Sequence, residues 1–121
     1  MGLITQEEAK NYLRVDAADD DALIAQLTEA AEALALDVAR LNESEAAAVE
    51  ADASDEAAFA TACTAAGITE REATEYRAVL RTAVFYTLGY LYEHREEADH
   101  RDLTLTLRSL LFSIREGRPA T

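Results

Sequence analysis

The fold of this chain is decided by the stretch Ala83-Val84-Phe85-Tyr86-Thr87-Leu88-Gly89-Tyr90-Leu91-Tyr92, which is apolar on nearly every face of a helix. In a soluble protein such a helix is buried by neighbours on all sides. The stretch is about half of the roughly 20 residues that a membrane span requires, so we expect no membrane insertion. A capping-box pair, Thr69 and Glu72, precedes it. The helical pattern continues to about Ala98, which predicts a central helix of roughly 29 residues and about 43 Å.

Two further helices are predicted on the N-terminal side. Thr5 and Glu8 form another capping box, which begins a short helix that runs to about Leu13. The acidic run 16–21 supplies N-cap candidates for a second helix that continues to about Leu41. Apolar residues recur in this helix at steps of three and four, which predicts one stripe that faces the core or another subunit. The stripe consists of Leu23, Leu27, Ala30, Ala31, Leu34, Val38 and Leu41.

The middle of the chain is acidic and rich in alanine. Between residues 42 and 54 the apolar stripe disappears, and we expect a mobile acidic loop there. A short alanine-rich helix is expected to follow, with an apolar side made of Ala57, Phe59, Ala60, Cys63 and Ala66. Gly67 is suited to end this helix because glycine adopts the left-handed C-cap conformation without strain.

The last predicted helix, over residues 102–114, has an apolar face made of Leu103, Leu107, Leu110, Leu111 and Ile114. Residues 103–107 also alternate as in a strand, but the longer spacing favours a helix, and a short tail of residues 115–121 follows. With four glycines and one proline, the chain lacks the turn residues that an all-β fold needs. The sequence therefore predicts an all-α fold. It is expected to be one domain over residues 1–121, a compact bundle of four to five helices around one long central helix.

The charge balance excludes one class of function. The 121 residues include 24 acidic and 11 basic side chains, a formal charge of -13. Non-specific binding to nucleic acid needs a basic face, which this chain lacks. Lys10 is the one lysine, and the acidic surface suits hydration at high salt, so we hypothesise a salt-loving or GC-rich host. At about 1 M salt the Debye length is only about 3 Å, which screens the self-repulsion.

No constellation of residues predicts catalysis. Cys63 is the one cysteine and lies among alanines, which favours an inert packed thiol over a nucleophile. His94 and His100 could be imagined as metal ligands, but residues six apart do not share one face of a straight helix. We therefore expect no enzyme activity, no cofactor and no metal. Residues 1–4 are too short for a signal peptide, so a cytosolic protein or a component of a soluble particle is expected.

Two parts of the chain carry a recognisable pattern. The first reads Leu3-Ile4-Thr5-x-Glu7-Glu8-Ala9-Lys10-x-Tyr12-Leu13-Arg14-Val15-Asp16, followed by Asp20-Asp21-Ala22-Leu23-Ile24 and an alanine-rich helix. The second reads Leu91-Tyr92-Glu93-His94-Arg95-Glu96, followed by the leucine-rich segment 103–115. In this order and spacing the two parts, about two-thirds of the chain, resemble the head-tail connector family of tailed phages. Residues 42–75 depart from the pattern, because that connection is often shorter and carries aromatic and glycine residues.

The resemblance implies a structural protein of the virion at the capsid-tail junction, assembled in the host cytoplasm. Such protomers form a ring, commonly of twelve subunits, between the portal protein and a downstream head-closure or tail protein. DNA passes through the ring and is not specifically bound, and a channel lined by carboxylates would repel it. The acidic surplus fits such a conduit and a salt-adapted surface equally well. An alternative from the charge is an acidic helical DNA mimic that inhibits a basic partner protein.

Candidate site residues fall into three groups. The resemblance implies a portal contact made by Leu111, Ile114, Arg115 and Arg118, whereas by sequence alone the two arginines complement the helix dipole. A subunit interface or core is predicted from Leu27, Leu34, Phe85, Tyr86, Gly89 and Tyr90, with Gly89 allowing another backbone to come close. A structural ion pair is predicted between Arg95 and a carboxylate of the first loop, either Asp16 or Asp20.

Overall fold

A computed structural model describes residues 3–51, 54–94, 101–112 and 114. These residues form six helices and no strand: α1 (Gln6–Leu13), α2 (Asp21–Ala39), α3 (Glu43–Glu50), α4 (Glu56–Ala66), α5 (Glu70–Glu93) and α6 (Arg101–Leu110). The all-α prediction is confirmed, with six helices in place of the expected four or five. None of the helices among the described residues is long and apolar enough to serve as a membrane span.

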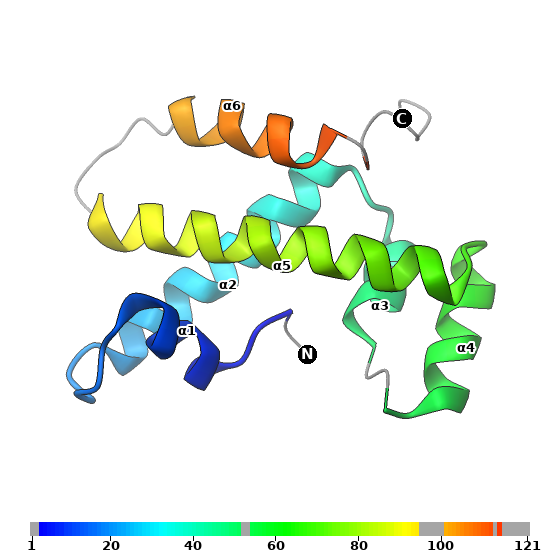
Figure 1. The fold of residues 1–121 in the computed structure, drawn as a ribbon, viewed down its shortest axis with the longest axis horizontal. Coiled ribbons are helices and arrows are strands. Elements are labelled where there is room, and N and C mark those ends of the chain that lie inside the picture. Colours follow the sequence, from blue (N-terminus) through cyan, green and yellow to red (C-terminus); the bar gives the residue numbers. More distant parts are fainter. Residues whose placement is uncertain (1–2, 52–53, 95–100, 113, 115–121) are drawn as a thin grey trace.

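The long helix α5 is the centre of the molecule. The helix α2 packs across it, while α1 and α6 lie on opposite sides of α5 (Figure 1). The core between these helices includes Ile24 of α2, Leu80 and Leu88 of α5, and Leu107 of α6, all fully buried. Small residues on α2, Ala31 and Ala35 among them, are also fully buried and allow its backbone to approach its neighbours closely. The apolar middle of α5 is thus largely covered within one chain.

The starts of α1 and α5 are those that the sequence predicts. Thr5 and Glu8 form a reciprocal capping box on α1, and Thr69 and Glu72 form another on α5. In each box the side chain at the N-cap and the side chain three residues on both accept backbone N–H groups that would otherwise lack partners. Gly67 ends α4 at a φ of 73°, in the left-handed conformation that favours glycine.

The prediction of a loop over residues 42–54 is wrong for its greater part. Asn42 and Glu45 form a third capping box, which starts α3. Ala48 and Val49 give this short helix a buried face. Asn42 is an efficient N-cap residue, and two small apolar side chains are enough to dock this eight-residue helix although no long stripe is present.

The ends of the last two helices also differ from the prediction. The helix α5 ends at Glu93 and not near Ala98, because His94 leaves the helical region with φ -118° and ψ 44°; residues 95–100 lie outside the described part of the chain. Residues 103–107 are helical, as the apolar spacing of this segment predicts. Leu103 and Leu107 are fully buried while Leu105 between them is half exposed, which is the periodicity of a helix and not of a strand.

The helices α3 and α4 form a second, smaller cluster at the N-terminal end of α5. Its buried members are Ala48, Phe59, Cys63 and Ala73. Arg77 of α5 donates a hydrogen bond of 2.7 Å to the carbonyl of Val49, which fixes the C-terminal end of α3. Burial raises the pKa of the Cys63 thiol, as expected for an inert packed cysteine.

Candidate interaction site

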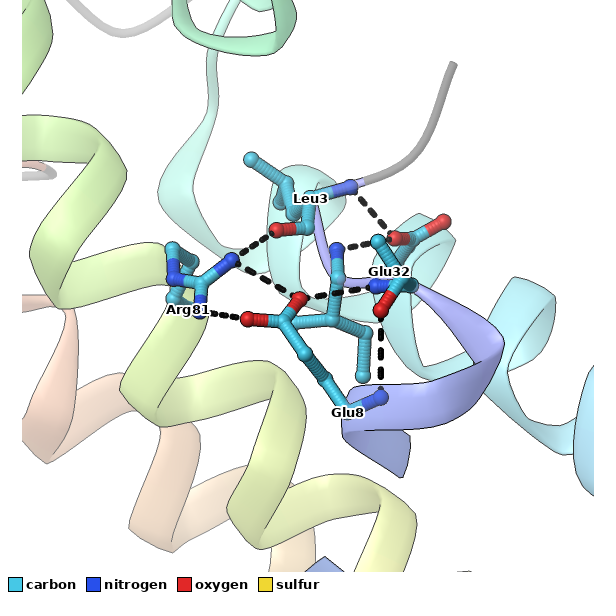
Figure 2. A network of polar contacts seen from close by, with 6 residues as sticks. Leu3, Glu8, Glu32 and Arg81 are labelled. Carbon is cyan, nitrogen blue, oxygen red and sulfur yellow. Dashed lines mark hydrogen bonds and ion pairs between the residues drawn. The ribbon is translucent and has the colours of Figure 1, made fainter. Parts of the chain in front are cut away.

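The N-terminal segment is fastened to α5 by one arginine. Arg81 Nη1 donates to the carbonyl oxygen of Leu3 at 2.6 Å and to Glu8 Oε1 at 3.3 Å, and Nη2 donates to Glu8 Oε2 at 2.6 Å (Figure 2). Such a two-pronged contact between guanidinium and carboxylate has a fixed geometry as well as favourable energy. The start of the recognisable N-terminal pattern is therefore held against the middle of the central helix.

A second carboxylate, from Glu32 of α2, binds the backbone N–H groups of this segment. Glu32 Oε2 accepts the backbone N–H groups of Leu3 and Ile4, at 2.5 Å and 3.2 Å (Figure 2). The Leu3 and Ile4 side chains are buried in the core, so their backbone polar groups need partners inside the protein. We call Leu3, Glu8, Glu32 and Arg81 the N-terminal clamp.

The pKa of Glu8 is held at about 2, below its ordinary value of 4.5. The hydrogen bond from Arg81 is the largest cause, and the backbone N–H of Thr5 is the next. Because the pKa is lower in the folded state, this carboxylate stabilises the fold above about pH 4.5, and its contribution is lost as the pH falls towards 2.

Glu8→Gln tests this, since glutamine keeps the acceptor for the Thr5 N–H and removes the charge. In urea unfolding, the wild type is expected to be more stable than the variant at pH 6, and the gap should close by about pH 2. A gap that stays constant over this range would contradict the assigned role of the Glu8 charge.

An open groove lies where the C-terminal end of α1 meets that of α5. It has a volume of about 630 Å³, and its lining includes Tyr12, Arg14, Tyr86, Tyr90, Tyr92 and Glu93. The ring of Tyr12 packs on Phe85 with 5.0 Å between ring centroids, and a Cβ added at Gly89 would lie 3.2 Å from that tyrosine. Gly89 therefore makes room for a side chain of its own protomer, where the sequence suggested the backbone of another.

The first loop is linked to α5 by a tyrosine. Tyr92 donates its hydroxyl to Asp20 Oδ2 at 2.7 Å. Arg95, the predicted partner of Asp20 or Asp16, lies outside the described residues, and Asp16 is exposed. The two halves of the chain are thus joined near the predicted place by a hydrogen bond that the sequence did not indicate.

Removing this hydroxyl should weaken the fold slightly. Tyr92→Phe is expected to lower the free energy of unfolding by about 1 kcal/mol, the usual net contribution of one hydrogen bond. Tyr86→Phe is the matched control, because Tyr86 is on the same helix and exposed. Chemical denaturation measures both, and equal effects of the two substitutions would contradict the role of the Tyr92 hydroxyl.

The predicted portal and interface residues have different positions. Leu111 and Ile114 are buried in the core, so their side chains hold α6 in place and present no outer surface; Arg115 and Arg118 lie outside the described residues. Four predicted interface residues are partly buried against the core, namely Leu27, Leu34, Phe85 and Tyr90. Tyr86 is 39% exposed and lines the groove, so of this group it is the clearest surface residue.

The contacts described at this site are side-chain packing, hydrogen bonds and the ion pair between Arg81 and Glu8. Among the described residues no group of three or more His, Cys, Asp or Glu side chains could hold a metal ion. The sequence did not predict Glu32, Arg81 or Tyr12 as site residues. No family model, curated protein or solved structure matches the chain.

Proposed function

We propose that this chain is a head-tail connector, a structural protein that forms a ring below the portal and links the capsid to the tail. The observation that carries the proposal is the N-terminal pattern of residues 3–24, in its order and spacing. The fold supports it in one respect. The two parts of the chain that carry the resemblance are packed in one core. In the part that departs from the pattern, Val49 joins this core and the other buried apolar side chains form a separate small cluster.

Contacts at three places along α5 join the first pattern to this helix. Glu8 binds Arg81, Tyr12 packs at Gly89, and Asp20 accepts the Tyr92 hydroxyl. These contacts are spread over more than ten residues of α5, so the N-terminal segment is held along the C-terminal half of that helix. Such an arrangement supports a rigid protomer that acts by shape and contact, without a catalytic step.

In the proposed assembly the protomer contacts the portal through its C-terminal end. Arg115 and Arg118 are suited to an acidic portal surface, and the buried Leu111 and Ile114 would hold α6 in position behind them. A downstream head-closure or tail protein binds the opposite face of the ring. DNA passes through without being bound, because the acidic chain repels phosphate.

The test is binding to the portal protein encoded in the same genome. The purified chain should co-sediment with assembled portal, and negative-stain images should show an added ring below it. Arg115→Glu with Arg118→Glu should weaken binding at least tenfold, whereas Arg71→Glu, a control on the exposed start of α5, should leave it unchanged. A chain that neither co-sediments with portal nor adds density would overturn the proposal.

The formal charge of -13 favours a second candidate, an acidic helical protein that mimics DNA and occupies a basic partner. The two functions respond differently to competitor duplex DNA. Binding of a DNA mimic to its partner is lost when duplex is added, because both use the same basic face. Binding of a connector to portal is not lost when duplex is added. A neighbouring nuclease or repressor gene whose product binds the chain competitively with DNA would favour the mimic.

A further inference from the structure

The exposed large apolar side chains among the described residues gather in two places. Tyr12 and Tyr86 lie in the groove between α1 and α5, and the others lie on or just beyond α6, namely Leu105, Leu110 and Phe112. The two patches are on different helices, and α1 and α6 lie on opposite sides of α5 (Figure 1). Two different apolar patches on one protomer are what a head-to-tail contact between copies requires.

The outer face of α6 carries a short stripe. Leu105 and Phe112 are 50% and 58% exposed. Phe112 lies two residues beyond the end of α6, and its spacing of seven from Leu105 is that of residues on one helix face. Arg108, which is also exposed, lies between them. The stripe is therefore apolar at its two ends and cationic in the middle, on a helix whose other face is fully buried in its own protomer.

The groove can accept each of these features. Its two exposed tyrosines, Tyr12 and Tyr86, offer apolar ring surface to Leu105 and Phe112, and aromatic faces also attract a guanidinium. Glu93 at the rim supplies a carboxylate for Arg108. Arg14 and His94 line the groove as well, so Glu93 is the acidic group of that lining.

The distribution of charge along the chain also favours contact between the C-terminal part of one copy and the rest of another. Residues 101–121 carry four arginines against two acidic side chains, whereas residues 1–100 carry a net charge of -15. The C-terminal part therefore has a net positive charge in an acidic chain, and it is attracted to the rest of a second copy. Charge complementarity therefore favours a second copy as the occupant of the groove.

We propose that the α6 stripe of one copy docks in the α1–α5 groove of the next, with Arg108 facing Glu93 of its neighbour. Each copy then offers one patch and receives the other, and the contact repeats from copy to copy. It closes into a ring when the rotation between copies allows it and otherwise gives a filament. Only this closure rests on the proposed connector function.

A charge-reversal cycle tests the contact. Arg108→Glu or Glu93→Arg alone should weaken self-association at least fivefold in sedimentation velocity at 0.15 M salt, because each places like charges together. The double variant restores the opposite charges in reversed order and should return to within about twofold of the wild type. Arg71→Glu is the control and should have little effect. A double variant no better than the single ones would overturn the pairing.

Disulfide trapping decides the matter if the wild type is monomeric up to about 1 mM. In a Cys63→Ala background, chains with Glu93→Cys are mixed with chains carrying Arg108→Cys under oxidation. The mixture should form dimers at least five times faster than either variant alone or than the exposed Ala65→Cys control on α4. Equal rates would overturn the proposal. Trapping without portal binding would instead refute the connector function and leave the contact between copies standing.

Discussion

Leu107→Ala is expected to lower the free energy of unfolding by about 3 kcal/mol, the largest effect predicted for this chain. Leu107 is fully buried between α6 and the rest of the core, and removing a leucine side chain at such a site costs both its transfer free energy and the cavity that remains. Urea unfolding followed by circular dichroism measures the change, with the midpoint and slope both recorded.

Leu105→Ala is the matched control for this substitution. The two leucines are on the same helix two residues apart, but Leu105 is half exposed, so its loss should cost no more than about 0.5 kcal/mol. The comparison also separates helix from strand, because residues 105 and 107 would face the same side of a strand. Equal effects of the two substitutions would contradict the position of α6. Both are measured at low protein concentration, where contact between copies is negligible.

Arg81→Met is expected to cost about 2 kcal/mol. The substitution keeps the aliphatic stem but removes the donors to Leu3 and Glu8, and hydrogen bonds to charged groups contribute about 1.5 to 3 kcal/mol each when sheltered. The sum is discounted because the side chains of Arg81 and Glu8 are 31% and 37% exposed. Thermal or urea unfolding at pH 7 measures the loss.

The control for Arg81→Met is Arg71→Met on the same helix. Arg71 Nε and Glu75 Oε2 are 3.9 Å apart, and the two side chains are 88% and 63% exposed. This ion pair should therefore contribute almost nothing to the free energy of unfolding. A double-mutant cycle with Glu8→Gln adds a sharper test: the two substitutions should be less than additive, since they remove one shared contact. Full additivity would show that the clamp is not a coupled unit.

The sequence predicted the elements whose signals are local. Capping boxes at Thr5 and Thr69, the glycine at position 67 and the leucine spacing of α6 all depend on residues a few positions apart. Each prediction is confirmed, except that Leu110, predicted on the apolar face of the last helix, is 37% exposed. The helix α3 was missed because its apolar face is only Ala48 and Val49, too short for a periodic signal. Its capping box, Asn42 with Glu45, was present in the sequence and was the available clue.

The candidate site was less predictable because its contacts join distant positions. Glu8 and Arg81 are 73 residues apart. No local sequence signal indicates which of the many carboxylates binds Arg81. Gly89 was recognised as a place of close approach, but the identity of the approaching group, Tyr12, follows only from how α1 packs on α5. The exposure of Leu105 and Phe112 likewise depends on which side of α6 is covered.

The small cluster of α3 and α4 has a consequence for the dynamics of the chain. Its buried side chains are two alanines, one phenylalanine and one cysteine, so little apolar surface opposes its opening, and local opening requires less free energy where few such contacts are broken. Amide hydrogens of α3 and α4 are therefore expected to exchange with solvent well before those of α2 and the middle of α5. We therefore expect this end of the protein to open more often than the rest of the fold.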